Sequence, residues 1–232
     1  MRGRVMQVWS NLGWLAMALA ISACAENQHH LTTHYLDQFA TPNPTLAHFT
    51  VCHGFNCVQK SPVSLNEDQW RRVTAVFKPP AKSVQLERQQ IGRAIALIES
   101  YVGPQAGIAA KQWTHKYMLV LPNMGDLTQI DCVDASVNTW TYMTLMERAG
   151  LFHFHKVAPL SYAGSFTDPD LRNTAVVQET GGGYFAVDAS LVDHEKPPLI
   201  MPLAVWLDTW PPDKTKIEHI AAADATTEPQ GR

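Results

Sequence analysis

The chain has 232 residues, a formal net charge of −3 and a charged fraction of 17%. A nucleic-acid-binding surface needs clustered lysine and arginine to displace counterions from phosphates, and this composition provides no such surface, so we expect no nucleic acid as a partner. A hydrophobic fraction of 46%, with 7 Trp and 8 Phe, is typical of a packed domain and excludes disorder of the whole chain.

Residues 1–23 predict an export signal. Arg2 and Arg4 supply positive charge, and an apolar stretch begins at Leu12 and ends in small residues before Cys24. This stretch is shorter than the about 20 apolar residues that a membrane-spanning helix needs. An ordinary secretory signal or an uncleaved anchor is the alternative to a lipoprotein signal.

The small residues that end in Cys24 resemble the processing site of bacterial lipoprotein signal peptides. In that family the cysteine becomes the lipidated N-terminus. The resemblance therefore implies that residues 1–23 are removed and that a lipid on Cys24 attaches the protein to a membrane. The second mature residue is Ala25 rather than Asp, which by the same resemblance implies export to the outer membrane of the cell envelope, facing the periplasm.

Composition predicts one domain between two polar segments. Residues 24–46 are polar and contain several His and Pro, which is typical of a flexible tether, although a histidine-rich tether could instead hold a metal ion. Residues 47–210 are long enough for one globular domain with a substantial core. Residues 211–232 are polar and predict a flexible tail.

Three cysteines remain once Cys24 is assigned to a lipid. Cys52 and Cys57 flank a short loop whose Gly and Asn permit the turn that a local disulfide needs. The spacing, with His53 inside the loop, could instead hold a metal, but structural zinc requires four ligands and typically closer cysteine pairs. We expect the disulfide, and no metal or other cofactor. The pairing leaves Cys132 as a single thiol that is buried, bonded to another chain or reactive.

Hydrophobic periodicity predicts an α+β domain. Apolar residues at helical spacing predict helices at residues 66–78, 84–102 and 131–149. Alternating or short apolar runs predict strands at residues 49–51, 151–157, 174–178, 184–188 and 199–203. We therefore expect helices packed on an antiparallel sheet.

The strands at 174–178 and 184–188 flank a glycine-rich turn and predict a β-hairpin. If Glu179 pairs with Tyr184, then Asn173 and Asp188 lie diagonally on the same face of the sheet, close enough for a side-chain hydrogen bond. A shift of one residue in this register would place them on opposite faces.

Cys132 lies in the first turn of the third predicted helix. The positive end of the helix dipole favours a thiolate there, while Asp131 and Asp134 oppose it by like-charge repulsion. Asp131 is also a suitable N-cap for this helix. The alternative to a reactive thiol is a buried structural cysteine, since free cysteines are among the most buried residues.

A cysteine at a helix start, followed by a hairpin with an Asp on its second strand, resembles the transglutaminase-like branch of the cysteine peptidases. The resemblance covers roughly Gln129 to Trp206 and implies a transglutaminase-like or papain-like core. It implies Cys132 as the nucleophile and Asp188 as the acid that orients the base, although Asp188 could also be an ordinary turn residue. The family has His where this chain has Asn173, and asparagine cannot accept and return a proton near neutral pH.

The missing histidine leaves two functions open. His153 and His155, which share one face of the strand predicted at 151–157, could serve as a substitute base. The chain would then be a cysteine hydrolase or acyl transferase acting on amide bonds of peptide or peptidoglycan-type substrates. Without a substitute, the chain would be a non-catalytic lipoprotein that keeps the fold as a binding or assembly module with a degenerate site.

Overall fold

The computed structural model describes residues 31–108, 126–164 and 172–208. The predicted signal segment, the lipidation candidate Cys24 and the predicted tail lie outside these ranges. From Thr32 onward the described residues belong to one compact unit, and the description that follows concerns this unit. Among the described residues, no helix has both the length and the apolar character that crossing a membrane requires.

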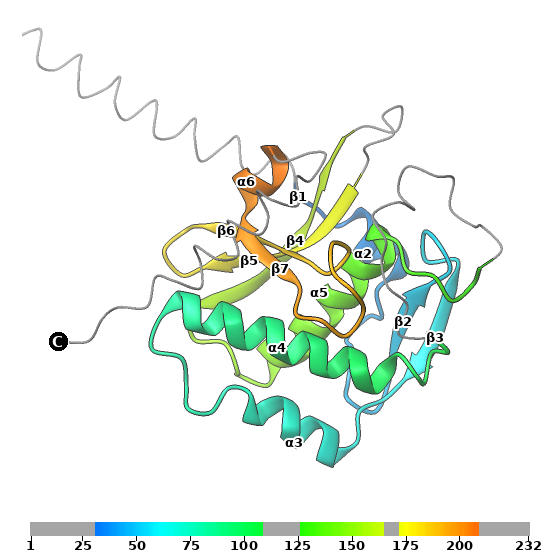
Figure 1. Ribbon diagram of the computed structural model, residues 1–232, viewed down its shortest axis with the longest axis horizontal. Helices are drawn as coiled ribbons and strands as arrows, with labels where there is room; N and C mark the ends of the chain where they lie inside the picture. Colours follow the sequence, from blue (N-terminus) through cyan, green and yellow to red (C-terminus); the bar gives the residue numbers. More distant parts are fainter. Residues whose placement is uncertain (1–30, 109–125, 165–171, 209–232) are drawn as a thin grey trace, which may run out of the picture. The chain divides into compact units, whose positions relative to one another are not determined.

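Two β-sheets make up the strand content of the described chain (Figure 1). The larger sheet has the order β1-β4-β5-β6-β7, with the bounds β1 Leu31–Thr32, β4 His155–Ala163, β5 Arg172–Glu179, β6 Tyr184–Asp188 and β7 Leu199–Pro202. Its neighbours from β4 to β7 pair antiparallel. The smaller sheet pairs β2 (Phe49–His53) with β3 (Gln59–Val63), also antiparallel.

Helices pack on these sheets, which confirms the α+β class. Their bounds are α2 His34–Phe39, α3 Glu67–Ala75, α4 Val84–Val102, α5 Cys132–Arg148 and α6 Leu203–Asp208. The helix α5 contacts β4 and β5 of the larger sheet and β2 of the smaller one, and so joins the two sheets (Figure 1). The three helices expected from periodicity are therefore present, and α5 is the central one.

Burial of α5 explains why its sequence carries apolar residues on more than one face. Val137, Tyr142 and Met143 are each at most 1% exposed. Asn138 is buried too, and its side chain accepts a hydrogen bond from the Cys52 amide (2.7 Å) and donates one to the Cys52 carbonyl (2.9 Å). These two bonds satisfy the buried amide and tie α5 to β2, because a buried polar group without a partner would be destabilising.

The first strand after α5 begins later than expected. It was predicted from residue 151, yet β4 starts at His155. The reason is Glu87 of α4, whose buried carboxylate accepts hydrogen bonds from the backbone amides of His153 (2.7 Å) and Phe154 (2.9 Å). These amides therefore bond to a side chain instead of a neighbouring strand, which corrects the predicted boundary.

Part of the predicted tether packs against the domain. Residues 31–46 were expected to be a flexible spacer, but they include β1 and α2, and Leu36 and Phe39 of α2 are each only 9% exposed. These two side chains lie three residues apart, on one face of a helical turn. The prediction of a tether is thus corrected for this stretch.

The hairpin of β5 and β6 forms with a register that differs by one residue from the predicted one. Gln178, rather than Glu179, pairs with Tyr184. The Glu179 amide instead donates to the Gly183 carbonyl (2.7 Å), and Gly182 has the positive φ of 102° that this tight turn requires. Because side chains alternate along a strand, the shift places Asn173 and Asp188 on opposite faces of the sheet.

A buried acid on α4 makes stability depend on pH. Glu99 is 7% exposed, its Oε2 accepts a hydrogen bond from the Glu195 amide (3.2 Å), and it lies 3.7 Å from His194 Nδ1. Burial raises the pKa of Glu99 from 4.5 to about 8. In the unfolded chain this acid loses its proton near its ordinary pKa, so between these two values the folded state binds more protons than the unfolded state.

We therefore predict that the free energy of unfolding falls as pH rises from 6.5 to 8. The slope from one such group approaches about 1.4 kcal/mol per pH unit. Burial lowers the pKa of His194, so its imidazole is neutral in the folded state while the unfolded chain still loses this proton around pH 6.5; the resulting slope has the opposite sign and fades above about pH 7.5. Asp134, whose pKa is also raised to about 8, adds a slope of the same sign as that of Glu99.

Urea unfolding of Glu99→Gln across this range measures the contribution of Glu99. The variant should lose about 1 kcal/mol per pH unit of the slope while the part from Asp134 remains. The exposed Glu67, changed to Gln, is the matched control and should keep the parent slope. Equal slopes in the parent and in Glu99→Gln would contradict the assignment.

Candidate functional site

The site is built around the start of α5. Asp131 is the N-cap, and its Oδ1 accepts a hydrogen bond from the Asp134 amide (2.8 Å). Asp134 Oδ2 in turn accepts one from the Asp131 amide (3.0 Å). This reciprocal capping box satisfies two backbone donors that a helix start otherwise leaves without partners, and it fixes Cys132 as the first residue of the helix.

The same two acids hold the loop that joins Cys52 to Cys57. The second oxygen of Asp131 accepts a hydrogen bond from the Asn56 amide (2.7 Å), and Asp134 Oδ1 accepts one from the Cys57 amide (2.6 Å). Phe55, Asn56 and Cys57 have φ values of 70°, 52° and 53°, a conformation that is unfavourable for residues with a Cβ. The two carboxyl groups therefore stabilise a turn whose backbone conformation is unfavourable for these residues.

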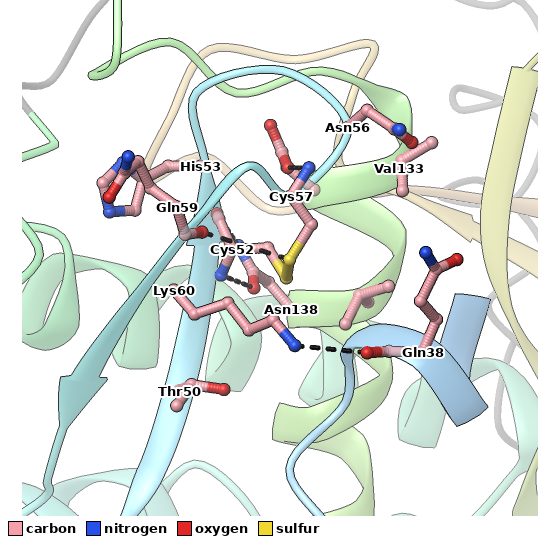
Figure 2. The surroundings of a disulfide bond; sticks show 12 residues. Gln38, Thr50, Cys52, His53, Asn56, Cys57, Gln59, Lys60, Val133 and Asn138 are labelled. Carbon is pink, nitrogen blue, oxygen red and sulfur yellow. Dashed lines mark hydrogen bonds between the residues drawn. A yellow bond between two sulfur atoms is a disulfide. The ribbon is translucent and has the colours of Figure 1, made fainter.

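The predicted disulfide between Cys52 and Cys57 is present (Figure 2), and it excludes these two cysteines as thiolate ligands of a metal ion. Within the described ranges, the single group of three ligand-type residues whose ligand atoms lie within 4.8 Å of one another is Cys52, Cys57 and Asp134. The two sulfurs are bonded to each other and so offer no thiolate to a metal ion. His53 is engaged as well, with Nδ1 2.5 Å from the Leu127 carbonyl oxygen and Nε2 2.8 Å from Ser61 Oγ.

Cys132 and Asn173 meet where α5 begins and β5 begins. The side-chain Nδ2 of Asn173 lies 3.9 Å from Cys132 Sγ. Asn173 is 1% exposed, and its Oδ1 has no hydrogen-bond partner among the described residues. The structure thus brings together the positions at which the resemblance expects a nucleophile and its base, but the group facing the sulfur is an amide.

The surroundings keep the thiol protonated. Burial raises the pKa of Cys132 to about 12, and repulsion from Asp131 adds to this. Hydrogen bonds from the backbone and side-chain amides of Asn173 act in the opposite direction, but they do not outweigh burial. At pH 7 only about 10⁻⁵ of such a thiol is thiolate, and the thiolate is the nucleophile.

Tyr35 is a member of this cluster that the sequence did not indicate. Burial raises the pKa of its hydroxyl, and the nearby Cys132 and Asp131 add to this rise. A hydrogen bond with the Asn173 side chain partly offsets it. The residue belongs to α2, inside the segment predicted as a tether. Only its contacts with residues about 100 or more positions away reveal its place, and periodicity in a six-residue helix carries little signal.

Asp188 lies near the cluster but bonds elsewhere. Its Oδ1 accepts hydrogen bonds from the amide (2.9 Å) and hydroxyl (2.6 Å) of Ser190, and its Oδ2 accepts one from Trp206 Nε1 (2.7 Å). The guanidinium of Arg172 stacks on the Trp206 ring at 4.4 Å. Burial raises the pKa of Asp188, while these bonds and Arg172 partly offset that effect. In the described chain, no hydrogen bond joins Asp188 to Asn173, so this acid fixes α6 rather than the cluster.

The two candidate histidines lie at the other end of β4. His155 is paired across the sheet with Glu179, and its Nδ1 is 2.9 Å from Glu87 Oε1. Asn173 is paired with Tyr162, seven positions further along β4, which corresponds to roughly 20 Å at about 3.3 Å per residue. His153, whose backbone amide also bonds to Glu87, belongs to the same end. The structure therefore does not bring His153 or His155 to Cys132.

Comparison with models of protein families, with curated proteins and with solved structures found no match for this chain. Function is therefore inferred from the geometry of the described residues and from the sequence. That geometry joins a protonated thiol, an amide and a phenol at one helix start.

We predict that the capping box contributes more to stability than an ordinary cap because it also holds the disulfide loop. Replacing Asp131 with Ala removes the acceptors for the amides of Asp134 and Asn56, and it should cost about 1–3 kcal/mol. Asn66→Ala is the matched control. This variant removes the capping box of α3, in which the side chains of Asn66 and Gln69 bond only each other's backbone amides and hold no loop. It should cost about 1 kcal/mol.

Urea unfolding at pH 6 compares the two variants. At this pH Asp134 keeps its proton because its pKa is raised to about 8 by burial and by Asp131, so relief of repulsion contributes little to the result. Equal losses in Asp131→Ala and Asn66→Ala would mean that the loop contact adds nothing.

Proposed function

We propose that this chain is a cell-envelope lipoprotein whose domain acts as a non-catalytic binding or assembly module with a degenerate transglutaminase-like site. The observation that carries the proposal is the contact between Cys132 and Asn173. Within the described ranges, the groups that shift the pKa of the thiol include Asp131, Asn173 and Asp188, Tyr35 also interacts with the thiol, and none of these groups is an imidazole.

The chemistry of these groups favours binding over catalysis. A cysteine nucleophile needs a base that takes its proton, and general-base catalysis contributes about 10²- to 10⁴-fold in such reactions. An amide cannot take that proton. The acid that would orient a base is bonded to Ser190 and Trp206 instead.

The location in this proposal comes from the N-terminal sequence. Cys24 carries the lipid, the membrane is the partner through that lipid, and Ala25 directs the protein to the outer membrane on the periplasmic side. The ligand class is peptide or peptidoglycan-type amides, the class whose binding a degenerate site of this kind would retain. The pattern of residues 1–25 supports the address, and the cluster at Cys132 supports the binding role.

A cysteine hydrolase or acyl transferase is the second candidate, favoured by one observation. Cys132 is the first residue of a helix and faces the start of a strand, as the resemblance requires of a nucleophile. In that case the oxyanion donors would be backbone amides at the start of α5. This candidate needs a general base beyond the groups described around the thiol.

The rate of alkylation by iodoacetamide as a function of pH separates the two functions. In a Cys24→Ser background, Cys132 is the single free thiol beside the disulfide. Because burial raises the pKa of Cys132 to about 12, we predict that the folded protein reacts at pH 7.5 at least about 100-fold more slowly than the unfolded protein. Fast labelling near neutral pH that Asp188→Ala slows would favour the hydrolase.

Asn173→His tests whether the missing imidazole is the reason why the Cys132 thiol reacts slowly. A histidine facing the sulfur would take its proton and form an ion pair, so labelling at pH 7.5 should rise about tenfold or more. Asn173→Gln keeps an amide and should stay at the parent rate. If the histidine variant labels no faster than the glutamine variant, burial rather than the missing base controls the thiol.

A further inference from the structure

Ser61 and His53 form a hydrogen-bonded pair on the smaller sheet. The register pairs His53 with Gln59 and Val51 with Ser61, so Ser61 lies two residues along β3 from the partner of His53. Residues two apart on a strand share a face of the sheet, and diagonal neighbours on that face are within reach of each other. The distance from His53 Nε2 to Ser61 Oγ is 2.8 Å, so a hydroxyl and an imidazole are in direct contact.

The backbone carbonyl of Leu127 fixes the orientation and the tautomer of His53. Its oxygen lies 2.5 Å from His53 Nδ1. A carbonyl oxygen can only accept a hydrogen bond, so in the neutral imidazole Nδ1 carries the proton and Nε2 offers its lone pair. The Ser61 hydroxyl then donates its hydrogen bond to Nε2. This is the order of nucleophile, base and orienting acceptor that activates a serine, with a carbonyl in place of the usual carboxylate.

Neighbouring backbone hydrogen bonds hold the orienting carbonyl in place. The Gly54 amide, directly after His53, donates to the Gln129 carbonyl (2.7 Å), which ties the turn that contains Leu127 to the end of β2. The Gln129 amide donates to the Asp126 carbonyl (3.2 Å) and closes this turn. The imidazole is therefore oriented by the fold itself, which is what general-base catalysis requires.

The serine is accessible in part, whereas its base is buried. Ser61 is half-buried between Lys60 and Pro62, which are both exposed. His53 is 7% exposed, so water competes little for its two hydrogen bonds. A small molecule that reaches this part of β3 would meet the hydroxyl before the imidazole.

Apolar side chains are exposed beside the pair. Val58 is 63% exposed and Leu127 is 47% exposed. Val58 Cγ1 and Leu127 Cα lie 3.1 Å and 3.4 Å from the position that a Cβ on Gly54 would occupy, so both residues approach the backbone next to His53. Apolar surface at this position favours contact with an apolar part of a ligand.

The residue after Ser61 restricts the class of substrate. In serine hydrolases with a nucleophile elbow, the backbone amide of that residue donates to the oxyanion, but here the residue is Pro62, which has no N–H. Loss of one oxyanion donor costs about 10²- to 10³-fold in rate. An acyl donor with a good leaving group, such as an aryl ester or a thioester, tolerates this loss better than an amide does.

We propose that Ser61 is a nucleophile that accepts acyl groups from activated esters or thioesters, with His53 as its general base. Ser61 Oγ forms a bond to the acyl carbon, the bond from that carbon to the leaving oxygen or sulfur breaks, and the Oγ proton passes through His53 Nε2 to the leaving group. Water then attacks the acyl carbon with His53 as the base, the bond to Ser61 breaks, and Oγ regains its proton. This activity goes beyond the proposed function.

Acetylation by p-nitrophenyl acetate tests the proposal in the full chain with Cys24→Ser, and mass spectrometry of its peptides locates the acetyl group. General-base catalysis contributes about 10²- to 10⁴-fold, so at short times Ser61 should be acetylated about 100-fold or more faster than the exposed Ser64 of the same molecule. In urea, the unfolded chain should acetylate both serines equally slowly. The corresponding amide, p-nitroacetanilide, should release no nitroaniline.

Substitutions identify the nucleophile and the base. Ser61→Ala should abolish acetylation of this peptide and the rapid phase of nitrophenolate release, while Ser64→Ala should change neither. His53→Gln removes the base and should slow acetylation of Ser61 about 100-fold. Circular dichroism shows whether each variant is folded. If His53→Gln does not fold, the ratio of the rates in the folded and the urea-unfolded parent decides.

The proposal would be overturned if Ser61 of the folded parent is acetylated no faster than Ser64, or if folded His53→Gln keeps the parent rate. Cleavage of the anilide as fast as the ester would overturn the substrate class. The proposed function fails differently, by turnover of an amide substrate that Cys132→Ser abolishes, and that outcome does not depend on acetylation of Ser61.

Discussion

The carboxyl groups of Asp131 and Asp134 accept the hydrogen bonds on which the rest of the site depends. Together they accept hydrogen bonds from four backbone amides, two at the start of α5 and two in the disulfide loop. One pair of acids thus fixes both a helix start and a turn that would be unfavourable alone. Burial raises the pKa of Asp134 to about 8, and repulsion from Asp131, which is held close to it, adds to this rise. The arrangement that gives Cys132 its place therefore also opposes its ionisation.

The disulfide and Asn138 extend this anchoring to β2. The disulfide closes the loop whose amides meet the two acids, and Asn138 bonds both backbone groups of Cys52 one turn further along α5. The first turns of α5 are thus held from the side of the smaller sheet, while Asn173 approaches Cys132 from the larger one. The thiol thus lies between two supports, one from each sheet.

Local patterns predicted the parts of this site that depend on neighbouring residues. Sequence spacing was enough to expect Asp131 as the N-cap of α5 and the disulfide, which is contained within six consecutive residues, whereas the reciprocal bond from Asp134 appears only in the structure. The register of the hairpin depended on one turn, in which Gly182 lets Glu179 pair with Gly183, and a difference of one residue moved Asp188 to the opposite face. The start of β4 depended on the hydrogen bond between Glu87 and the amide of His153, which lie 66 positions apart. The position of Tyr35 depended on interactions with residues about 100 or more positions away. Such contacts leave no periodic signal in the chain.

The register of the hairpin also bears on catalysis by a chain that has Asn173 where the resemblance expects a histidine. A catalytic triad needs a base that faces the thiol and an acid that bonds to this base. In this structure an amide occupies the position of the base. The acid is not in place either, because Asp188 bonds to Trp206 and Ser190 on the other face of the sheet. A histidine at position 173 would meet the sulfur but not this acid, so its tautomer and orientation would remain unfixed. Restoring proton transfer would therefore require a change at β6 or α6 as well, and the chain lies at least two changes away from a complete triad built on these residues.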